Sequence, residues 1–250
     1  MPTVLVTGGG RGIGRAIALA FAEPGSTVAV ASRTRSELET TGKEIEKRGA
    51  KALLLTADVT DEASVAAAFK AFGGKAIDVV VNNAGIGGGL PIDETDTASW
   101  RRILDTNVWG TFLVTRQAVP LLKDGGRVVN ISSVLGRFGV PGYTAYCASK
   151  HAVIGFTRAL ALELAGRRIT VNAICPGWVE TDMALQGMSS GATAMGITVE
   201  QFKEQAMSRV PIGRMIQPDE VAALVKFLAS PATSAITGQT YNICGGQTMD

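Results

Sequence analysis

The chain has 250 residues, of which 46% are hydrophobic and 18% charged, and its formal net charge is +2. This composition can fill a large hydrophobic core, which excludes an intrinsically disordered chain, and the scattered charge disfavours a nucleic-acid-binding protein. Three widely spaced cysteines provide neither a disulfide framework nor a paired-cysteine metal site, and no uncharged apolar run approaches the length of a membrane span. We therefore expect a cytoplasmic protein without a metal.

Short β-branched, apolar runs alternate with helical patterns along the whole chain. Strands are predicted at residues 3–6, 27–31, 52–56, 77–81, 127–131, 169–174 and 240–243. Helices are predicted at residues 13–21, 36–48, 61–72, 98–122, 146–164 and 220–228. This alternation is typical of the α/β class and predicts a Rossmann-type, doubly wound parallel sheet with helices on both faces, formed by residues 1–250 as one domain.

One stretch, residues 182–198, breaks the alternation and is rich in Gly, Ser, Met and Ala. Ligand sites in such sheets lie beside the carboxyl ends of the strands, and long insertions late in the chain often cover them. We expect a flexible lid segment around residues 180–205. A disordered surface loop without such a role is the alternative.

A glycine-rich loop, residues 7–14, joins the first predicted strand to the first predicted helix. Its glycines allow a tight turn and a close approach of the backbone to a phosphate, and the helix that follows offers unpaired N–H groups. The loop could be a simple turn, but its place in a strand–helix–strand series predicts a nucleotide site. The expected contacts come from Gly8, Gly12, Ile13 and Gly14.

The end of the second predicted strand distinguishes NAD from NADP. An NAD site places an acid there, whereas this chain has Ser32 and Arg33. The Arg33 guanidinium can form bidentate hydrogen bonds with a 2′-phosphate. Arg11 in the glycine-rich loop is a second candidate for this contact. The alternative is that both arginines are ordinary surface residues. We expect NADP(H) as the cofactor.

Seven sequence motifs, in order along the chain, make it resemble the short-chain dehydrogenase/reductase family over essentially its full length. The motifs are Thr7-Gly8-x-x-x-Gly12-x-Gly14, Asp58-Val59, Asn82-Asn83-Ala84-Gly85, Asn107, Ser133, Tyr146-x-x-x-Lys150 and Pro176-Gly177. The resemblance implies seven parallel strands and a nicotinamide cofactor. It also implies assembly as a homotetramer or homodimer, in which the dimer uses the helices that start near Val108 and Tyr146.

The resemblance also assigns cofactor contacts. Asp58 and the Val59 backbone would face the adenine, and the segment from Asn82 to Gly85 would close the wall behind the cofactor. Further contacts are implied for the following residues: Asn83, Ala84, Gly85, Pro176, Gly177, Val179 and Thr181. Asn107 would hold a water in a proton relay that ends at Lys150.

Tyr146 and Lys150 are four residues apart in a predicted helix, so their side chains share one face. A nearby ammonium favours the phenolate and should lower the tyrosine pKa from about 10, which suits a proton donor and acceptor. Ser133 would stabilise the substrate oxygen, and the spacing known in the family selects it over Ser132. A solvent-facing pair would be the better interpretation of Tyr146 and Lys150 if the other motifs were missing.

These features predict an NADPH-dependent oxidoreductase that reduces a ketone to a secondary alcohol. His151 is the only histidine, so a histidine-based triad or a zinc site is disfavoured. The segments expected around the substrate are mostly apolar, and the chain is most similar to 3-oxoacyl-thioester reductases of the fatty-acid and aromatic-polyketide types. An acyl-carrier protein would then deliver the substrate, with Arg137 as a candidate basic contact. A general carbonyl reductase or secondary alcohol dehydrogenase and a non-catalytic NADP sensor remain alternatives.

Overall fold

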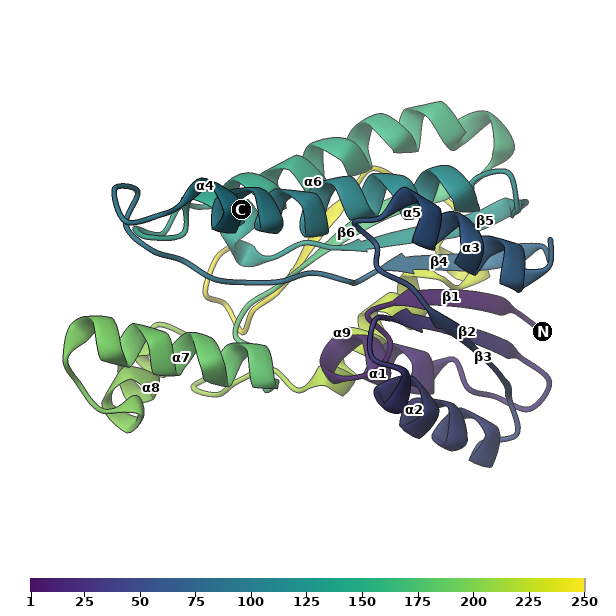
Figure 1. Ribbon diagram of the computed structural model, residues 1–250. Coiled ribbons are helices and arrows are strands. Elements are labelled where there is room, and N and C mark those ends of the chain that lie inside the picture. The colour runs from purple at the N-terminus through teal and green to yellow at the C-terminus, as the bar shows by residue number, and fades with distance from the viewer. Residues whose placement is uncertain (250) are drawn as a thin grey trace.

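Seven strands, rich in Val, Ile, Leu and Ala, form one all-parallel sheet in the computed structural model, which describes residues 1–249 (Figure 1). The strand order β3-β2-β1-β4-β5-β6-β7 confirms the doubly wound prediction. The strands are β1 (Thr3–Thr7), β2 (Thr27–Ser32), β3 (Lys51–Thr56), β4 (Ile77–Asn82), β5 (Leu122–Ile131), β6 (Thr170–Pro176) and β7 (Thr240–Ile243). The inner strands β1, β2, β4 and β6 are almost continuously buried, as a sheet covered on both faces requires, whereas the edge strands β3 and β7 are mostly half-buried.

Nine α-helices surround the sheet within residues 1–249. They are α1 (Gly12–Ala20), α2 (Arg35–Lys47), α3 (Glu62–Phe72), α4 (Thr97–Leu104), α5 (Gly110–Ala118), α6 (Thr144–Leu164), α7 (Asp182–Met195), α8 (Val199–Ser208) and α9 (Pro218–Leu228). None of these described helices combines the length and the hydrophobicity that a membrane span needs.

The two faces of the sheet carry separate hydrophobic cores. Alternate residues of β1 point to opposite faces: Val4 and Val6 join the core beneath α1, α2 and α9, whereas Leu5 joins the core beneath α3, α5 and α6. Figure 1 shows the two helix layers on either side of the sheet. The active-site elements are therefore held by a rigid, two-sided scaffold.

The prediction of one long helix at residues 98–122 is wrong in two respects. A π-helical turn, Asp105–Trp109, separates α4 from α5, and α5 ends at Ala118, four residues before the predicted end. The apolar pattern misled the prediction because it continues past Pro120 into Leu122, which pairs with Ile77 as the first residue of β5. Such π-turns are frequent at functional sites.

The lid segment contains the helices α7 and α8, at positions where the sequence pattern predicted no helix. Thr198 caps α8 with a reciprocal pair of bonds to Gln201, of 2.9 and 3.2 Å. The helices α7 and α8 pack closely, because a Cβ added to Gly191 of α7 would lie 2.4 Å from the Phe202 ring of α8. Trp178 also contacts the Phe202 ring edge-to-face. The small residues that suggested flexibility instead permit this close packing.

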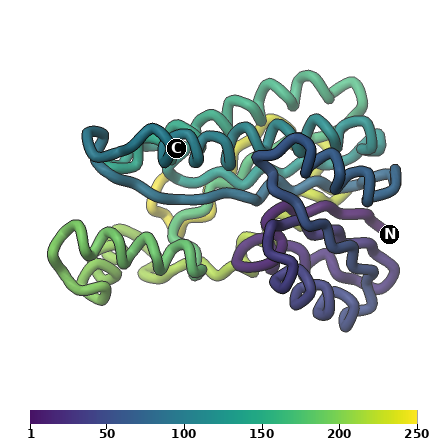
Figure 2. Tube along the Cα trace, in the orientation of Figure 1, coloured from purple at the N-terminus to yellow at the C-terminus, as the bar shows by residue number. Residues whose placement is uncertain are grey.

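The two connections of the lid segment to the sheet lie side by side. Val179 and Ile216 form a parallel bridge, in which Glu180 N–H donates to the Ile216 carbonyl and Ile216 N–H donates to the Trp178 carbonyl. The two helices, green in Figure 2, extend away from the sheet, at the end opposite the amino terminus. They therefore lie at the carboxyl ends of the strands.

Candidate active site

The glycine-rich loop forms a tight turn into α1. Gly8 and Gly12 have φ angles of +64° and +52°, which favour glycine, and a Cβ on Gly14 would lie 2.2 Å from the Gly8 carbonyl oxygen. Arg11, the N-cap residue, makes no side-chain bond to the first turn of α1, which also contains no acid. The first N–H groups of α1, including that of Ile13, are thus suited to an anionic phosphate.

Thr7 and Asn83 join the glycine-rich loop to the end of β4. The Thr7 hydroxyl accepts bonds of 3.0 Å from the backbone N–H groups of Asn83 and Ala84. The Asn83 side-chain amide donates to the carbonyls of Thr7 and Gly8, at 2.9 and 3.3 Å. The expected wall behind the cofactor is therefore tied directly to the turn that would hold its phosphates. The positioning role of Thr7 was missed, although it starts the glycine motif.

The carboxyl ends of β2 and β3 hold the residues expected near the adenosine. Arg33 is exposed and takes part in no hydrogen bond or ion pair within residues 1–249. Asp58 accepts bonds of 2.9 and 2.8 Å from the N–H and hydroxyl of Thr60, and the buried Val59 packs against Gly110. These residues lie at the same edge of the sheet as the glycine-rich loop.

Glu37 is a neighbour of this region that the sequence interpretation missed. Its carboxylate lies 3.9 Å from Arg11 Nε, and a Cβ on Gly10 would lie 3.1 Å from its Oε2 and 3.3 Å from Ser32 Oγ. An acid here opposes a 2′-phosphate and partly neutralises Arg11. Only its position in the first turn of α2, shortly after Arg33, could have indicated this contact.

Glu37→Gln is therefore expected to lower the KM for NADPH, by up to about fivefold given the ~1 kcal/mol of an exposed ion pair. The change releases Arg11 and removes a negative charge, whereas the KM for NADH should change little. Steady-state kinetics with both cofactors measures this. Glu39→Gln is the matched control, because Glu39 pairs with Arg35 on the same helix. A higher KM for NADPH in Glu37→Gln would contradict the prediction.

The start of the lid segment meets the glycine-rich loop. Pro176 ends β6, and Gly177 follows where a Cβ would lie 3.0 Å from Cys244. The Thr181 side chain faces Gly12, whose added Cβ would lie 3.3 Å from Thr181 Cγ2. Val179, which is buried, anchors this passage through its bridge to Ile216. The residues implied to border the nicotinamide are thus adjacent to the phosphate turn.

Ser133, Tyr146 and Lys150 converge where β5 ends and α6 begins. The Ser133 hydroxyl accepts a 3.1 Å bond from Leu135 N–H and is hydrogen-bonded to the Tyr146 phenol. Lys150 Nζ lies 5.6 Å from the Tyr146 ring centroid and donates to the Ile131 carbonyl at 3.0 Å. Ser132 instead donates to the Lys150 carbonyl at 2.9 Å, so the two neighbouring serines point differently, as alternation along a strand predicts.

The pKa of Tyr146 departs from the sequence-based expectation. Burial raises the pKa of Tyr146 to about 12, and the hydrogen bond from Ser133 opposes this rise only in part. Burial also lowers the pKa of Lys150 to about 8. Lys150 is not among the causes of the Tyr146 shift, of which desolvation is the largest, so the expected lowering of the phenol pKa by the ammonium stays a prediction for the complex with cofactor. At neutral pH the phenol keeps its proton and can donate it.

The pH profile of kcat/KM for NADPH, which reports ionisations of the free enzyme, is expected to fall above about pH 8. Lys150 loses its positive charge there, whereas Tyr146, with a pKa of about 12, remains protonated. Lys150→Arg should lose activity and also lose this decline, because a guanidinium stays charged. The same decline in Lys150→Arg would assign it to another group.

Asn107 lies in the π-helical turn and is 1% exposed. Its Oδ1 accepts from Ile86 N–H at 2.9 Å, and its Nδ2 donates to the Ile86 carbonyl and to Ser149 Oγ, both at 3.0 Å. Both amide hydrogens are thus taken by protein acceptors. A relay water could be bound only through the remaining lone pair of Oδ1 or through main-chain atoms.

Arg137 does not provide a free cation at the site. Its Nη2 turns inward and donates to the Thr240 carbonyl at 2.7 Å. Its guanidinium also favours the thiolate of Cys175, although burial is the larger effect and raises the pKa of that thiol. His151 is exposed and bonds only the Cys147 carbonyl within the described chain. Residues 1–249 contain no cluster of three His, Cys, Asp or Glu side chains suited to a metal ion.

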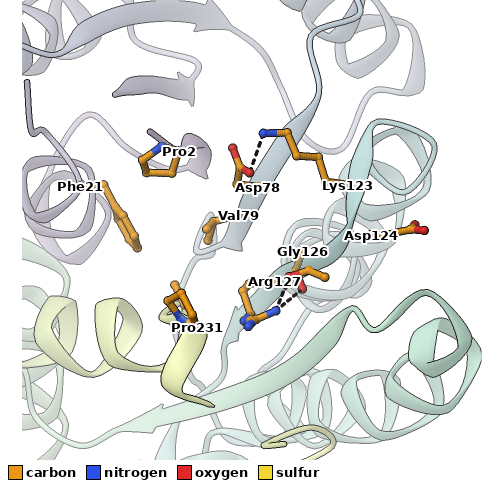
Figure 3. A pocket seen from close by; sticks show the side chains of 11 residues that line it. Pro2, Phe21, Asp78, Val79, Lys123, Asp124, Gly126, Arg127 and Pro231 are labelled. Atoms are coloured by element: carbon orange, nitrogen blue, oxygen red, sulfur yellow. Dashed lines mark hydrogen bonds and ion pairs between the residues drawn. The ribbon is translucent and has the colours of Figure 1, made fainter. Parts of the chain in front are cut away.

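A cavity of about 330 Å³ lies at the opposite, amino-terminal edge of the sheet (Figure 3). Asp78 and Lys123 form an ion pair of 2.7 Å at its border, and Arg127 donates to the carbonyls of Gly126 and Ser230 at 3.1 and 3.3 Å. These charged groups are therefore bonded within the protein, where they connect β4 to the first part of β5 and β5 to the segment after α9. The groups suited to redox chemistry all lie at the other edge.

The family model described as enoyl-(acyl carrier protein) reductase matches residues 8–248. A protein of Streptomyces coelicolor that is named as a ketoacyl reductase is 43% identical, over 97% of this chain and 95% of that protein. The 3-oxoacyl-(acyl-carrier-protein) reductase of Thermotoga maritima is 39% identical, over 97% and 96%. The crystal structure of an actinorhodin polyketide ketoreductase variant with NADPH is 41% identical, with a TM-score of 0.89 over 98% of this chain and 97% of that one.

The family-model match covers residues 8–14 of the glycine-rich loop, the Ser133–Tyr146–Lys150 cluster and most of both cores. The model's description names an alkene reduction, whereas the two curated relatives carry the names of ketone reductases. The alternation of strands and helices, the phosphate turn and the buried tyrosine–lysine pair agree with this relationship. The chain belongs to the short-chain dehydrogenase/reductase family.

Proposed function

We propose that the protein is an NADPH-dependent ketoreductase that converts a 3-oxoacyl thioester or a polyketide-like ketone to a secondary alcohol. The observation that carries this proposal is the convergence of Ser133, Tyr146 and Lys150, with the Nζ of the buried Lys150 5.6 Å from the Tyr146 ring centroid. When bound, NADPH supplies a hydride to the carbonyl carbon. Tyr146 donates its proton to the carbonyl oxygen, and Ser133 orients that oxygen and stabilises the charge that develops on it.

The residues that would hold the cofactor fit it. The first turn of α1 has free N–H groups for the pyrophosphate, and Arg33 is exposed and available for a 2′-phosphate. The remaining predicted contacts come from Asp58, from the segment 83–85 and from Thr181. The known complex of a 41% identical ketoreductase with NADPH supports this choice of cofactor.

The surroundings of Tyr146 support a substrate with an apolar body. A Cβ on Gly87 would lie 3.7 Å from Met183 Sδ of the lid segment and 4.0 Å from Tyr146 Cε2. Met183 and Leu90 are about half exposed, at 47% and 48%. An acyl or polyketide chain would cover these side chains and extend between the lid segment and the loop that contains Leu90.

NADPH consumption with a panel of 3-oxoacyl thioesters, diketones and simple ketones tests the proposal. We expect the highest kcat/KM for the thioesters or for bulky diketones. Consumption with simple ketones alone would favour a general carbonyl reductase. The inward orientation of Arg137 supports this second candidate, because it removes the expected contact for an acidic carrier protein. Tight NADPH binding without consumption would instead indicate a cofactor sensor.

We also propose that the protein is cytoplasmic and assembles as a homotetramer or homodimer. Trp109 and Leu162, which are 43% and 82% exposed, support an interface on α6 and on the π-helical turn that precedes α5. Light scattering after size-exclusion chromatography distinguishes these states from a monomer. A monomer at micromolar concentration would contradict this part of the proposal.

A further inference from the structure

Ser149 is a fully buried hydroxyl that lies between Tyr146 and Lys150 in α6. It is 0% exposed, donates to the Tyr146 carbonyl at 2.8 Å and accepts from Asn107 Nδ2 at 3.0 Å. Its hydroxyl therefore joins the first turn of the helix that carries the reacting side chains to the π-helical turn between α4 and α5. The predicted reaction gives this residue no role.

The bonds of Asn107 extend this connection to a third element. Its amide forms two hydrogen bonds with the Ile86 backbone, and its remaining N–H goes to Ser149. Within residues 1–249, Ser149 is therefore the one partner through which the Asn107 side chain is bonded to α6. Without that acceptor a buried N–H would have no partner, which proteins rarely tolerate.

The three connected elements meet at the Lys150 ammonium. A Cβ on Gly85, which precedes Ile86, would lie 3.1 Å from Asn107 Oδ1 and 3.5 Å from Lys150 Nζ. The wall behind the cofactor, the π-helical turn and α6 thus approach one another within a few ångströms of this group. A small shift of the wall or of the π-helical turn would therefore change the packing around the ammonium.

We propose that Ser149 is a positioning residue for ketone reduction: it fixes the Asn107 amide and thereby holds the loop at Gly85 and Ile86 in register with Tyr146 and Lys150. This role rests on the proposed function. Ser149 acts through Asn107 and α6 and does not touch the reacting atoms. Its loss should therefore lower kcat far more than it weakens NADPH binding.

The chain offers a matched control two turns further along the same helix. Thr157 is also 0% exposed, donates to the Val153 carbonyl at 2.8 Å and accepts from the Asn130 amide at 2.9 Å. Its bonding repeats that of Ser149, but Asn130 connects to Asn82, the last residue of β4, and forms no bond with Asn107 or Ile86 within residues 1–249. Thr157→Val thus removes an equivalent buried bond of the same helix and leaves the connection between Ser149 and Asn107 intact.

The experiment compares Ser149→Ala with Thr157→Val in the full chain, by kcat, by NADPH Kd from fluorescence and by melting temperature. We expect kcat to fall about 10- to 100-fold in Ser149→Ala, the effect of a misplacement of up to about 1 Å. Thr157→Val should lower the melting temperature comparably and leave kcat within about twofold. Asn107→Ala combined with Ser149→Ala should be no worse than Asn107→Ala alone, because both changes break one connection.

Three results would overturn the proposal: an unchanged kcat in folded Ser149→Ala, an equal loss in Thr157→Val, or additive losses in the double variant. Ser149→Cys retains the side-chain size with a weaker acceptor and should give a smaller defect of the same kind, which provides a test if Ser149→Ala does not fold. The pKa of Lys150, followed by nitrogen NMR of the lysine side chains, should shift in Ser149→Ala and not in Thr157→Val. That readout needs no substrate, so an inactive wild-type protein would contradict the proposed function alone.

Discussion

Replacement of Tyr146 by phenylalanine is expected to lower kcat for ketone reduction by about 10²- to 10⁴-fold, the usual contribution of a positioned general acid. The change removes only the hydroxyl that is hydrogen-bonded to Ser133. With the phenol pKa raised to about 12, the wild-type group is almost entirely protonated at neutral pH, so the full proton-donating capacity is lost. Stopped-flow measurement of NADPH oxidation with the best ketone of the panel gives the size of the loss.

NADPH affinity separates this effect from a general disturbance of the site. Tyr146→Phe retains the ring against which Lys150 lies, so the Kd for NADPH should change by less than about threefold. Tyr241→Phe is the control, because Tyr241 packs against a core on β7, away from the Ser133 cluster. Turnover within a few-fold of wild type in Tyr146→Phe would remove this residue from the proton-donor role.

Arg33→Asp is expected to raise the KM for NADPH by about 10- to 100-fold, because a hydrogen bond to a charged group contributes about 1.5–3 kcal/mol. Arg33 has no partner within residues 1–249 that would compete for a 2′-phosphate. An aspartate at the end of β2 can instead accept a bond from a ribose hydroxyl, so the KM for NADH should stay constant or fall. The ratio of kcat/KM for the two cofactors measures the switch.

Arg35→Asp provides the comparison for Arg33→Asp. Arg35 is two residues further along, is similarly exposed and is paired with Glu39 at 2.9 Å. Its replacement changes the net charge equally but should leave the cofactor preference almost unaltered. An equal change in the KM for NADPH and for NADH in Arg33→Asp would contradict the phosphate-binding role of Arg33. The same change in cofactor preference in Arg35→Asp would also contradict it.

Features set by short-range chemistry could be predicted from the sequence. The doubly wound parallel sheet was predicted from the alternation of apolar runs and helices, and the tight turn at Gly8 and Gly12 from the freedom of glycine at positive φ. The proximity of Tyr146 and Lys150 followed from the helical period. Each of these depends on neighbours in the chain and not on distant packing.

Features set by long-range packing could not be predicted. Glu37 lies beside the cofactor region because α2 packs against the glycine-rich loop, and Arg137 turns inward because a β7 carbonyl accepts its guanidinium. The Tyr146 pKa depends on burial that the whole site creates. The π-helical turn around Asn107 follows from no sequence period, because its backbone geometry is supported by contacts with Ile86 and Ser149.

The bridge between Val179 and Ile216 has a consequence for redesign. This bridge joins the segment that leaves the sheet to the segment that returns to it. The helical hairpin of α7 and α8 therefore begins and ends at neighbouring positions. An exchange of this hairpin between related enzymes, with the junctions placed after Thr181 and before Ile216, keeps both the bridge and the contact of Thr181 with Gly12. The residues of the hairpin beside the substrate can thus change while the residues predicted to bind the cofactor stay the same.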